Sequence, residues 1–299
     1  MLRYQVIPYL FNISVIKPLL KDSKKSNDDL NNLRPVAISD VFANIYESIL
    51  LQELEKQYQD NNKQFGYKPK SSCSHAIFAL KQTVALIKNK NRRMYVAAID
   101  ASKAFDKVNR DTLWYKMIEL KIDPLVINGL KNYYDCSTMI VSNNDEHSTL
   151  FKTTIGVRQG GVISPKLFSI YMDKLMSDIE SLEHGVSFGD LKVDIIVYAD
   201  DILLIIETRN GLREQLNCVT EYGKENEIKF NPNKSVFMVF NKSTLNRMED
   251  RWQGPLELAG NRINQVTCMK YLGVEINDKE NSLDHIKTIK QKALSCIFK

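Results

Sequence analysis

Two adjacent aspartates, Asp200 and Asp201, interrupt the longest apolar stretch of the chain, between Ile-Ile-Val-Tyr-Ala at 195–199 and Ile-Leu-Leu-Ile-Ile at 202–206. Neighbouring carboxylates repel each other and are poorly solvated in such surroundings, so ionising both of them costs free energy. A divalent cation would offset that cost. The pattern therefore predicts a bound cation at this point of the chain.

The sequence on either side of this pair predicts its local structure. Both flanks are rich in Ile, Leu and Val, and each is too short for a helix. We expect two buried strands joined by a tight turn that carries both aspartates at its tip. An ordinary hairpin turn that happens to contain Asp is the alternative.

A third carboxylate, Asp100, follows the apolar run Met-Tyr-Val-Ala-Ala-Ile at 94–99. A strand that ends in Asp can direct an oxygen ligand at an ion shared with a distant hairpin. Mg²⁺ takes oxygen ligands and is usually completed by waters and substrate phosphates. Two such ions about 3.5 to 4 Å apart activate an attacking hydroxyl and stabilise the leaving oxygen in a displacement at phosphorus. A simple strand-end or capping role is the alternative for Asp100.

Composition limits the remaining classes of protein. The chain has 299 residues, of which 43% are hydrophobic and 26% charged, as in soluble globular proteins, and its net charge of +5 suits a polyanionic partner. The five cysteines are scattered and lack zinc spacing, which favours a reduced intracellular protein without structural zinc. No run reaches the roughly 20 apolar residues of a membrane span, and the N-terminal stretch does not read as a signal peptide.

Periodicity and turn residues predict one mixed domain without an internal linker. We expect helices at 41–58, 74–88, 110–120, 124–134, 164–181 and 211–227. We expect strands at 95–100, 139–141, 195–198, 202–207 and 235–240, and a hairpin over 256–276 that turns at Gly260-Asn261.

Six motifs in a fixed order resemble those of reverse transcriptases, particularly of non-LTR (LINE-type) retrotransposons and their group II intron relatives. Asp100 to Asp106 resembles motif A, and Tyr-Ala-Asp-Asp at 198–201 resembles motif C. The fingers motifs are matched by N-L-R-P-V-A-I-S at 32–39 and Q-F-G-Y at 64–67. Motif B is matched by G-V-R-Q-G-G-V-I-S-P at 156–165. Residues 223–234 resemble motif D, and Y-L-G-V at 271–274 resembles motif E.

The resemblance implies an α+β palm-and-fingers (right-hand) polymerase fold, in which helices back an antiparallel palm sheet. Residues 13–278 would form the reverse transcriptase domain, with most of the fingers before about residue 99. Residues 279–299 would begin a truncated thumb, and 282–299 within them are expected to form a basic amphipathic helix. A solvated charged face is the more common explanation for such a helix.

The resemblance also implies which residues form the catalytic centre. Asp100, Asp200 and Asp201 would hold two Mg²⁺ ions, with Mn²⁺ as a substitute, helped by the backbone carbonyl of Ile99 or Ala101. Lys234 resembles the motif D lysine that protonates the departing pyrophosphate. A surface lysine at a turn is the alternative there.

Five further residues would bind the incoming nucleotide. Lys21 and Arg34 would hold its triphosphate, because ammonium and guanidinium groups suit phosphate oxygens; a solvated loop is the alternative for Lys21. Phe105 would exclude a 2′-hydroxyl and so favour deoxynucleotides, with core packing as the alternative. Gln159 would hydrogen-bond the nascent base pair while Gly160 allows a close approach, unless this segment is only a helix start.

The function expected from these motifs is RNA-directed DNA synthesis as part of a retrotransposon. Its partners would be an RNA template, a DNA primer and dNTPs, in the nucleus or cytoplasm. Two rivals remain. One is an RNA-dependent RNA polymerase, against which Phe105 argues, and the other is a catalytically silent nucleic-acid-binding remnant.

Overall fold

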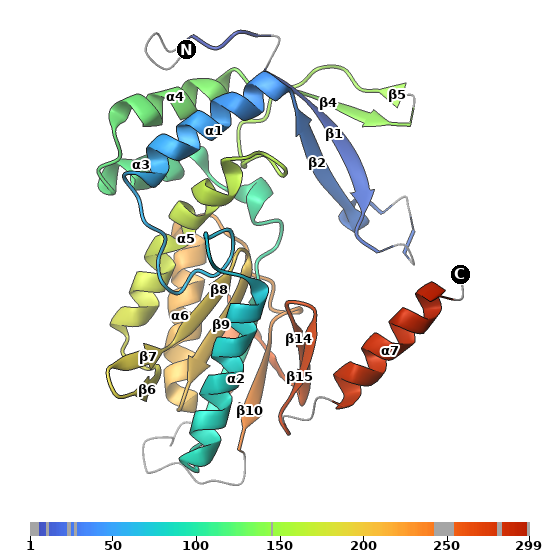
Figure 1. Ribbon diagram of the computed structural model, residues 1–299. Coiled ribbons are helices and arrows are strands. Elements are labelled where there is room, and N and C mark those ends of the chain that lie inside the picture. The colour runs from blue at the N-terminus through green and yellow to red at the C-terminus, as the bar shows by residue number, and fades with distance from the viewer. Residues whose placement is uncertain are drawn as a thin grey trace. The chain divides into compact units, whose positions relative to one another are not determined.

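The computed structural model describes residues 6–9, 12–22, 25–26, 29–144, 146–241, 254–279 and 283–297. The chain forms two compact units (Figure 1). Unit 1 consists of Met1–Asp60 and Lys103–Asp173, and unit 2 of Asn61–Ser102 and Lys174–Lys299. Both units are built from two separated segments of the chain, so no single linker divides them.

Unit 1 combines a four-stranded sheet with helices. Its strand order is β2-β1-β4-β5; β1 is antiparallel to β2 and parallel to β4. The strands are β1 (Ile13–Leu20), β2 (Leu33–Ser39), β4 (Thr138–Asn143) and β5 (Glu146–His147). The helices are α1 (Val41–Glu55), α3 (Arg110–Glu119), α4 (Pro124–Asp135), the first part of α5 (Ser164–Ser181), and the short 3-10 turns η2 (Leu30–Asn32) and η3 (Phe105–Lys107).

Side-chain caps fix where the helices of unit 1 begin. The side chain of Asp40 accepts a hydrogen bond from the backbone N–H of Phe42, and Asn109 caps α3 in the same way. Asp123 caps α4, whose first residue is Pro124. A capping side chain satisfies an N–H that has no partner inside the helix, and proline suits the first helical position.

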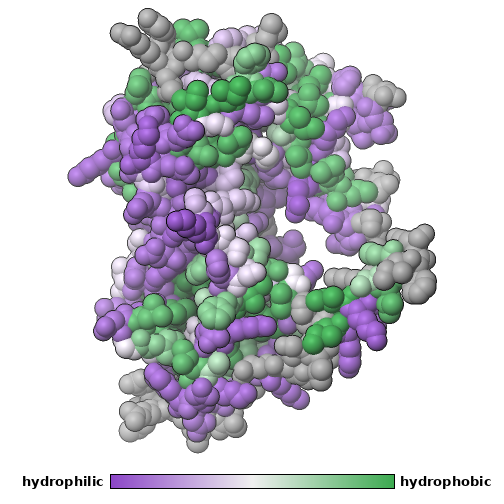
Figure 2. Space-filling model, in the orientation of Figure 1, coloured by the Kyte–Doolittle hydropathy of each residue, from purple (hydrophilic) through white to green (hydrophobic). Residues whose placement is uncertain are grey.

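One side of α1 is apolar yet exposed. Val41, Phe42, Ile45 and Ile49 are all between 43 and 68% exposed, and Figure 2 shows hydrophobic residues gathered where α1 and α4 lie. The opposite side of α1, which includes Tyr46 and Leu50, is buried. Apolar residues therefore occupy two sides of this helix, and their positions alone do not say which side faces the core.

Unit 2 is built on a five-stranded sheet with the strand order β13-β10-β3-β9-β8. All its neighbouring pairs are antiparallel except β10 with β13. The strands are β3 (Met94–Asp100), β8 (Ile195–Tyr198), β9 (Asp201–Ile206), β10 (Val236–Phe240) and β13 (Asn264–Gln265). The helices are α2 (Cys73–Asn89), α6 (Arg209–Glu225), α7 (Leu283–Ile297) and the end of α5.

Helices cover both faces of this sheet, whereas the sequence predicted them on one. Ile205 belongs to the core cluster formed with α2, while Ile206 contacts Gly211 at the start of α6. Successive residues of a strand point to opposite faces, so α2 and α6 lie on different sides. Residues 61–102, which include α2 and β3, belong to this unit.

Each predicted helix up to α6 is present, with its ends shifted by no more than three residues. The hairpin predicted over 256–276 is wrong in detail. It is two hairpins, β11 (Glu257–Leu258) with β12 (Asn261–Arg262) and β14 (Cys268–Tyr271) with β15 (Val274–Asn277). The first turns at Ala259-Gly260 and the second at Leu272-Gly273, where all four residues have positive φ. A further hairpin, β6 (Val186–Phe188) with β7 (Leu191–Val193), was not expected.

A fully buried polar cluster joins the elements of unit 1. Arg158 and Glu47 lie 3.6 Å apart, and neither side chain is exposed. The hydroxyl of Tyr133 accepts from Arg158 and donates to Glu47 over 2.7 Å. Arg158 also donates to Ser137 Oγ, and Glu47 accepts from the backbone N–H of Ile163. The cluster thus ties α1 and α4 to the loop before α5.

We predict that Glu47→Leu lowers the free energy of unfolding by about 3 to 5 kcal/mol, because it leaves the Arg158 charge buried without its partner. Urea unfolding followed by circular dichroism measures this. The control is Glu53→Ala, which removes an exposed ion pair with Lys56 and should cost less than about 1 kcal/mol. Equal losses in the two variants would contradict a stabilising role for the buried pair.

Candidate active site

The central strands of unit 2 bring three carboxylates to one end of the sheet. In the antiparallel pairing of β3 with β9, Asp100 lies directly opposite Asp201. Asp200 immediately precedes Asp201 in the turn that follows β8. Directly opposed residues of antiparallel strands have Cα atoms about 4.5 to 5.5 Å apart. Asp100 and Asp201, which are far apart in the chain, are therefore neighbours here.

The turn between β8 and β9 is tight and strained. Tyr198 pairs with Asp201, which leaves Ala199 and Asp200 as the two turn residues. Asp201 is thus the first residue of β9, and only Asp200 lies at the tip where both aspartates were expected. Ala199 is buried and has φ +57°, a left-handed conformation that costs a residue with a Cβ about 1 to 2 kcal/mol. Its surroundings must hold it there.

The electrostatics of the three carboxylates favour a cation. Partial burial, then repulsion from Asp200 and Asp100, raises the pKa of Asp201 to about 6. The Oδ2 atom of Asp100 is shielded from solvent and accepts no hydrogen bond from the described residues. The Nζ atom of Lys234 lies 3.9 Å from it, with a side chain that is 68% exposed. A shielded acceptor beside two further carboxylates suits a hard divalent ion.

Protein side chains alone do not complete a metal site. Within the described ranges, no three Asp, Glu, His or Cys side chains converge into a ready-made set of metal ligands. Mg²⁺ sites in phosphoryl-transfer enzymes commonly use one or two carboxylates and obtain the remaining ligands from waters and substrate phosphates. The donor set of unit 2 fits that kind of site.

Backbone direction distinguishes the two candidate carbonyl ligands. The N–H of Asn231 donates to the carbonyl of Asp100, so Asp100 directs its backbone groups toward β10. Its neighbours in the strand must direct theirs the other way, toward β9. Ile99 pairs there with Ile202, whereas Ala101 lies beyond the last paired residue, on the side of Asp200. This direction favours Ala101 over Ile99.

The two predicted triphosphate ligands share one face of the β1–β2 hairpin, in unit 1. Leu19 pairs with Arg34, and the N–H of Lys21 donates to the carbonyl of Asn32, which continues the pairing by one step. Lys21 and Arg34 are both exposed, and the Lys21 ammonium donates to the carbonyl of Asn31 over 3.0 Å. The sequence had indicated only a basic loop, because Pro18 and Pro35, which pair with each other here, are unfavourable in strands.

Phe105 begins η3 and is half-buried. Its ring stacks on that of Phe168 in α5, with centroids 4.6 Å apart and planes 18° from parallel. Its carbonyl accepts a hydrogen bond from the N–H of Val157. Its position is therefore compatible with both predicted roles, packing in the core and exclusion of a 2′-hydroxyl from the nucleotide.

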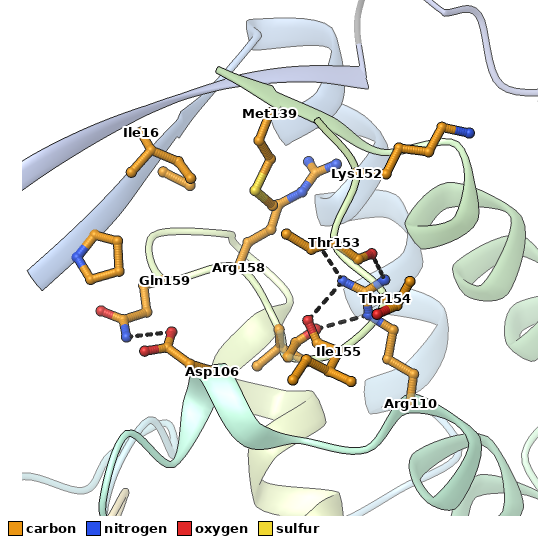
Figure 3. Close-up of a pocket in the computed structure, with 14 residues that line it drawn as sticks. Ile16, Asp106, Arg110, Met139, Lys152, Thr153, Thr154, Ile155, Arg158 and Gln159 are labelled. Carbon is orange, nitrogen blue, oxygen red and sulfur yellow. Dashed lines mark hydrogen bonds between the residues drawn. The ribbon is translucent and has the colours of Figure 1, made fainter. Parts of the chain in front are cut away.

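Gln159 and Gly160 lie against strand β2. The N–H of Ala37 donates to the carbonyl of Gln159 over 2.7 Å, and a Cβ on Gly160 would lie only 2.6 Å from the Ala37 carbonyl oxygen. Gly160 also has φ +105°, so no other residue fits here without strain. The side chain of Gln159 donates to Asp106 over 2.8 Å (Figure 3).

Gln159 and Asp106 line a cavity of about 380 Å³ within unit 1. Arg110 closes part of its wall by donating to the carbonyl oxygens of Thr153 and Gly156 (Figure 3). Burial, only partly offset by the bond from Gln159, raises the pKa of Asp106. Sequence reasoning assigned no role to Asp106, Arg110 or Arg158. Their presence within or beside motifs A and B was the only available signal.

The predicted residues thus fall into two sets, each assembled within its own unit. Asp100, Asp200, Asp201, Lys234, Ile99 and Ala101 belong to unit 2, and Lys21, Arg34, Phe105, Gln159 and Gly160 to unit 1. In the part of the chain with described coordinates, no helix has both the length and the apolar character needed to cross a bilayer.

Comparison with known proteins supports this assignment of motifs. A family profile described as reverse transcriptase (RNA-dependent DNA polymerase) matches residues 23–276. A Pol polyprotein from the type-2 retrotransposable element R2DM of Drosophila melanogaster is 24% identical over 266 residues, covering 87% of this chain and 24% of that protein. The RNA-directed DNA polymerase from the mobile element jockey of the same species is 25% identical over 285 residues, covering 91% of this chain and 30% of its own length.

Solved structures support the predicted fold class. The apo telomerase of Candida tropicalis truncated from its C-terminal domain superimposes with a TM-score of 0.59 at 14% identity, over 91% of this chain and 55% of that one. The same telomerase in complex with a fragment of telomeric RNA gives a TM-score of 0.57 at 15% identity, over 90% and 44%. The α+β palm-and-fingers fold is confirmed.

The chain spans about a quarter to a third of the length of the curated relatives it matches. Those relatives are polymerases and polyproteins of non-LTR retrotransposons, as the motifs had predicted. Since the profile covers most of the chain, from the fingers motifs through motif E, this protein belongs to the reverse transcriptase (RNA-dependent DNA polymerase) family.

Proposed function

We propose that this chain is the polymerase domain of a non-LTR retrotransposon, and that it joins deoxynucleotides to the 3′-hydroxyl of a primer on an RNA template. Reverse transcriptases generally use divalent ions and bind an RNA template. The observation that carries the proposal is the strand register that sets Asp100 opposite Asp201 and beside Asp200. Residues 13–278 are the polymerase domain, and 279–299 begin a thumb.

The three carboxylates and the carbonyl of Ala101 hold two Mg²⁺ ions, for which Mn²⁺ can substitute. When bound, such ions lower the pKa of the attacking hydroxyl and stabilise the charge on the leaving oxygen. The protein fixes the ligands on two adjacent strands of a buried sheet, so little reorganisation is needed when the nucleotide arrives. Lys234 stands beside Asp100 and delivers a proton to the departing pyrophosphate.

The residues of unit 1 select and orient the nucleotide. Arg34 and Lys21 bind the triphosphate from the basic face of the hairpin. Phe105 is backed by the ring of Phe168, so it forms a rigid wall that leaves no room for a 2′-hydroxyl. The side-chain nitrogen of Gln159 donates to Asp106, so the side-chain oxygen Oε1 is the atom that accepts a hydrogen bond from the nucleotide or base pair.

We predict that Asp200→Asn reduces primer extension by about 100-fold or more, because losing a metal ligand removes several kcal/mol of transition-state stabilisation. The assay supplies an RNA template, a DNA primer, dNTPs and Mg²⁺. Asp190→Asn, which changes an exposed carboxylate between β6 and β7, should retain activity. If the unmodified chain binds the RNA/DNA hybrid but never extends the primer, it is a silent remnant.

Phe105→Val should raise the relative kcat/KM for ribonucleotides over deoxynucleotides by about 10- to 100-fold, since it opens space beside the sugar. Steady-state incorporation of a single nucleotide measures the ratio. Phe78→Ala, which truncates a 62% exposed ring on α2, serves as the control. An unchanged ratio would mean that Phe105 only packs the fold.

The pKa of Asp201 predicts opposite effects on stability and activity. Since this pKa is raised above its unfolded value, the ionised carboxylate destabilises the fold at neutral pH, and protonation relieves that cost as pH falls through about 6. In metal-free buffer, Asp201→Asn should therefore have a higher Tm than the parent at pH 7.5. The difference should shrink below pH 6 and vanish near pH 4.

Activity of the parent chain should in contrast fall as pH drops, because protons compete with Mg²⁺ for the Asp201 carboxylate. Thermal unfolding and primer extension over pH 5 to 8 measure the two trends. A lower Tm for Asp201→Asn at pH 7.5 would contradict the repulsion among these carboxylates.

A further inference from the structure

The segment 61–67 runs beside β8, which is the last strand at one edge of the unit 2 sheet. The N–H of Val197 donates to the carbonyl of Lys63 over 2.9 Å, and the N–H of Phe65 donates to the carbonyl of Val197 over 2.7 Å. These two bonds form a parallel bridge between Gln64 and Val197. The segment therefore acts as a short additional strand next to the turn that carries Asp200.

A buried ion pair fixes the register of this segment. Both carboxylate oxygens of Asp194 accept hydrogen bonds from Lys63 Nζ, at 2.5 and 2.6 Å. Asp194 is fully buried and Lys63 is only 14% exposed. Removing either partner would leave a buried charge, so this arrangement resists slippage.

The pairing of this segment with β8 places the side chain of Gln64 against the Ala199-Asp200 turn. Gln64 is 1% exposed, and its Oε1 atom accepts from the N–H of Gly66 at 2.9 Å and from the N–H of Ala199 at 3.2 Å. Ala199 is the buried residue with φ +57°. A buried N–H without a partner is costly, so the Gln64 oxygen stabilises the one conformation of Ala199 that points its N–H at this oxygen.

Gly66 brings the segment into direct contact with the turn. A Cβ added to Gly66 would lie 2.6 Å from the backbone nitrogen of Ala199 and 3.1 Å from the carbonyl carbon of Tyr198. Both are backbone atoms and cannot rotate away. Only glycine allows this close approach, and the contact confines the turn that carries the solvent-exposed Asp200.

We propose that Gln64 is a positioning residue for metal-dependent nucleotidyl transfer: its amide oxygen locks the Ala199-Asp200 turn and so sets where the Asp200 carboxylate points. This inference rests on the proposed function of the carboxylates. A neutral amide is the suitable acceptor, because a carboxylate at position 64 would add negative charge next to a turn that already bears Asp200 and Asp201.

The test compares three variants of the full chain. Gln64→Leu keeps the size of the side chain and removes the acceptor. Gln64→Glu keeps the acceptor and adds a charge. Gln215→Leu is the matched control, since Gln215 is fully buried in α6 and its amide has no hydrogen-bond partner among the described residues.

For Gln64→Leu we expect kcat for single dNTP addition to fall about 10-fold or more, with KM for the dNTP changed less than about twofold, because the turn is misplaced while nucleotide binding stays intact. Gln64→Glu should fold and recover part of the kcat. Gln215→Leu should resemble the parent chain.

Hydrogen exchange in metal-free buffer supplies a readout that does not depend on activity. In Gln64→Leu, the amides of 198–201 should exchange faster while those of 94–100 stay protected. Unchanged exchange at 198–201, or a kcat no lower than that of Gln215→Leu, would overturn the positioning role. A parent chain without polymerase activity would instead overturn the proposed function, and the exchange experiment would still decide the role of Gln64.

Discussion

Repulsion among three carboxylates is the constraint that dominates one end of the unit 2 sheet. Asp100 and Asp201 are opposed across two strands, and Asp200 follows the strained residue Ala199. None of these features favours folding by itself. The buried strands β3, β8 and β9, whose side chains are almost all inaccessible to solvent, supply the stability that holds the charges together. The burial of these strands thus offsets the electrostatic cost of the carboxylates.

Much of this arrangement was predictable because the relevant signals are local. Hydrophobic periodicity and turn residues located the helices, and the Asp pair in an apolar run located the turn. The β1–β2 hairpin was missed because its strands contain prolines and charges, and its pairing depends on neighbours distant in sequence. The two hairpins after residue 256 were merged, because Leu272-Gly273 gives a weaker turn signal than Gly260-Asn261.

The residues that support the site were harder to find than those expected to carry out the chemistry. Glu47 and Arg158 form a buried pair across more than one hundred residues, and Gln64 reaches Ala199 across a similar separation. Such partners depend on tertiary packing, and a lone glutamine or glutamate in the sequence carries no sign of it. Arg158 and Gln64 do lie inside recognisable motifs, which indicates that these motifs include scaffold as well as chemistry.

The pairing of the segment 61–67 with β8 also affects the solubility of the chain. β8 is an edge strand of Ile, Ile, Val and Tyr, and a bare edge of that composition would offer unpaired N–H and C=O groups to the same strand in another molecule. By pairing with Val197, the segment blocks such intermolecular pairing beside the Ala199-Asp200 turn. A chain that loses this cover would expose the β8 edge to self-association and aggregation.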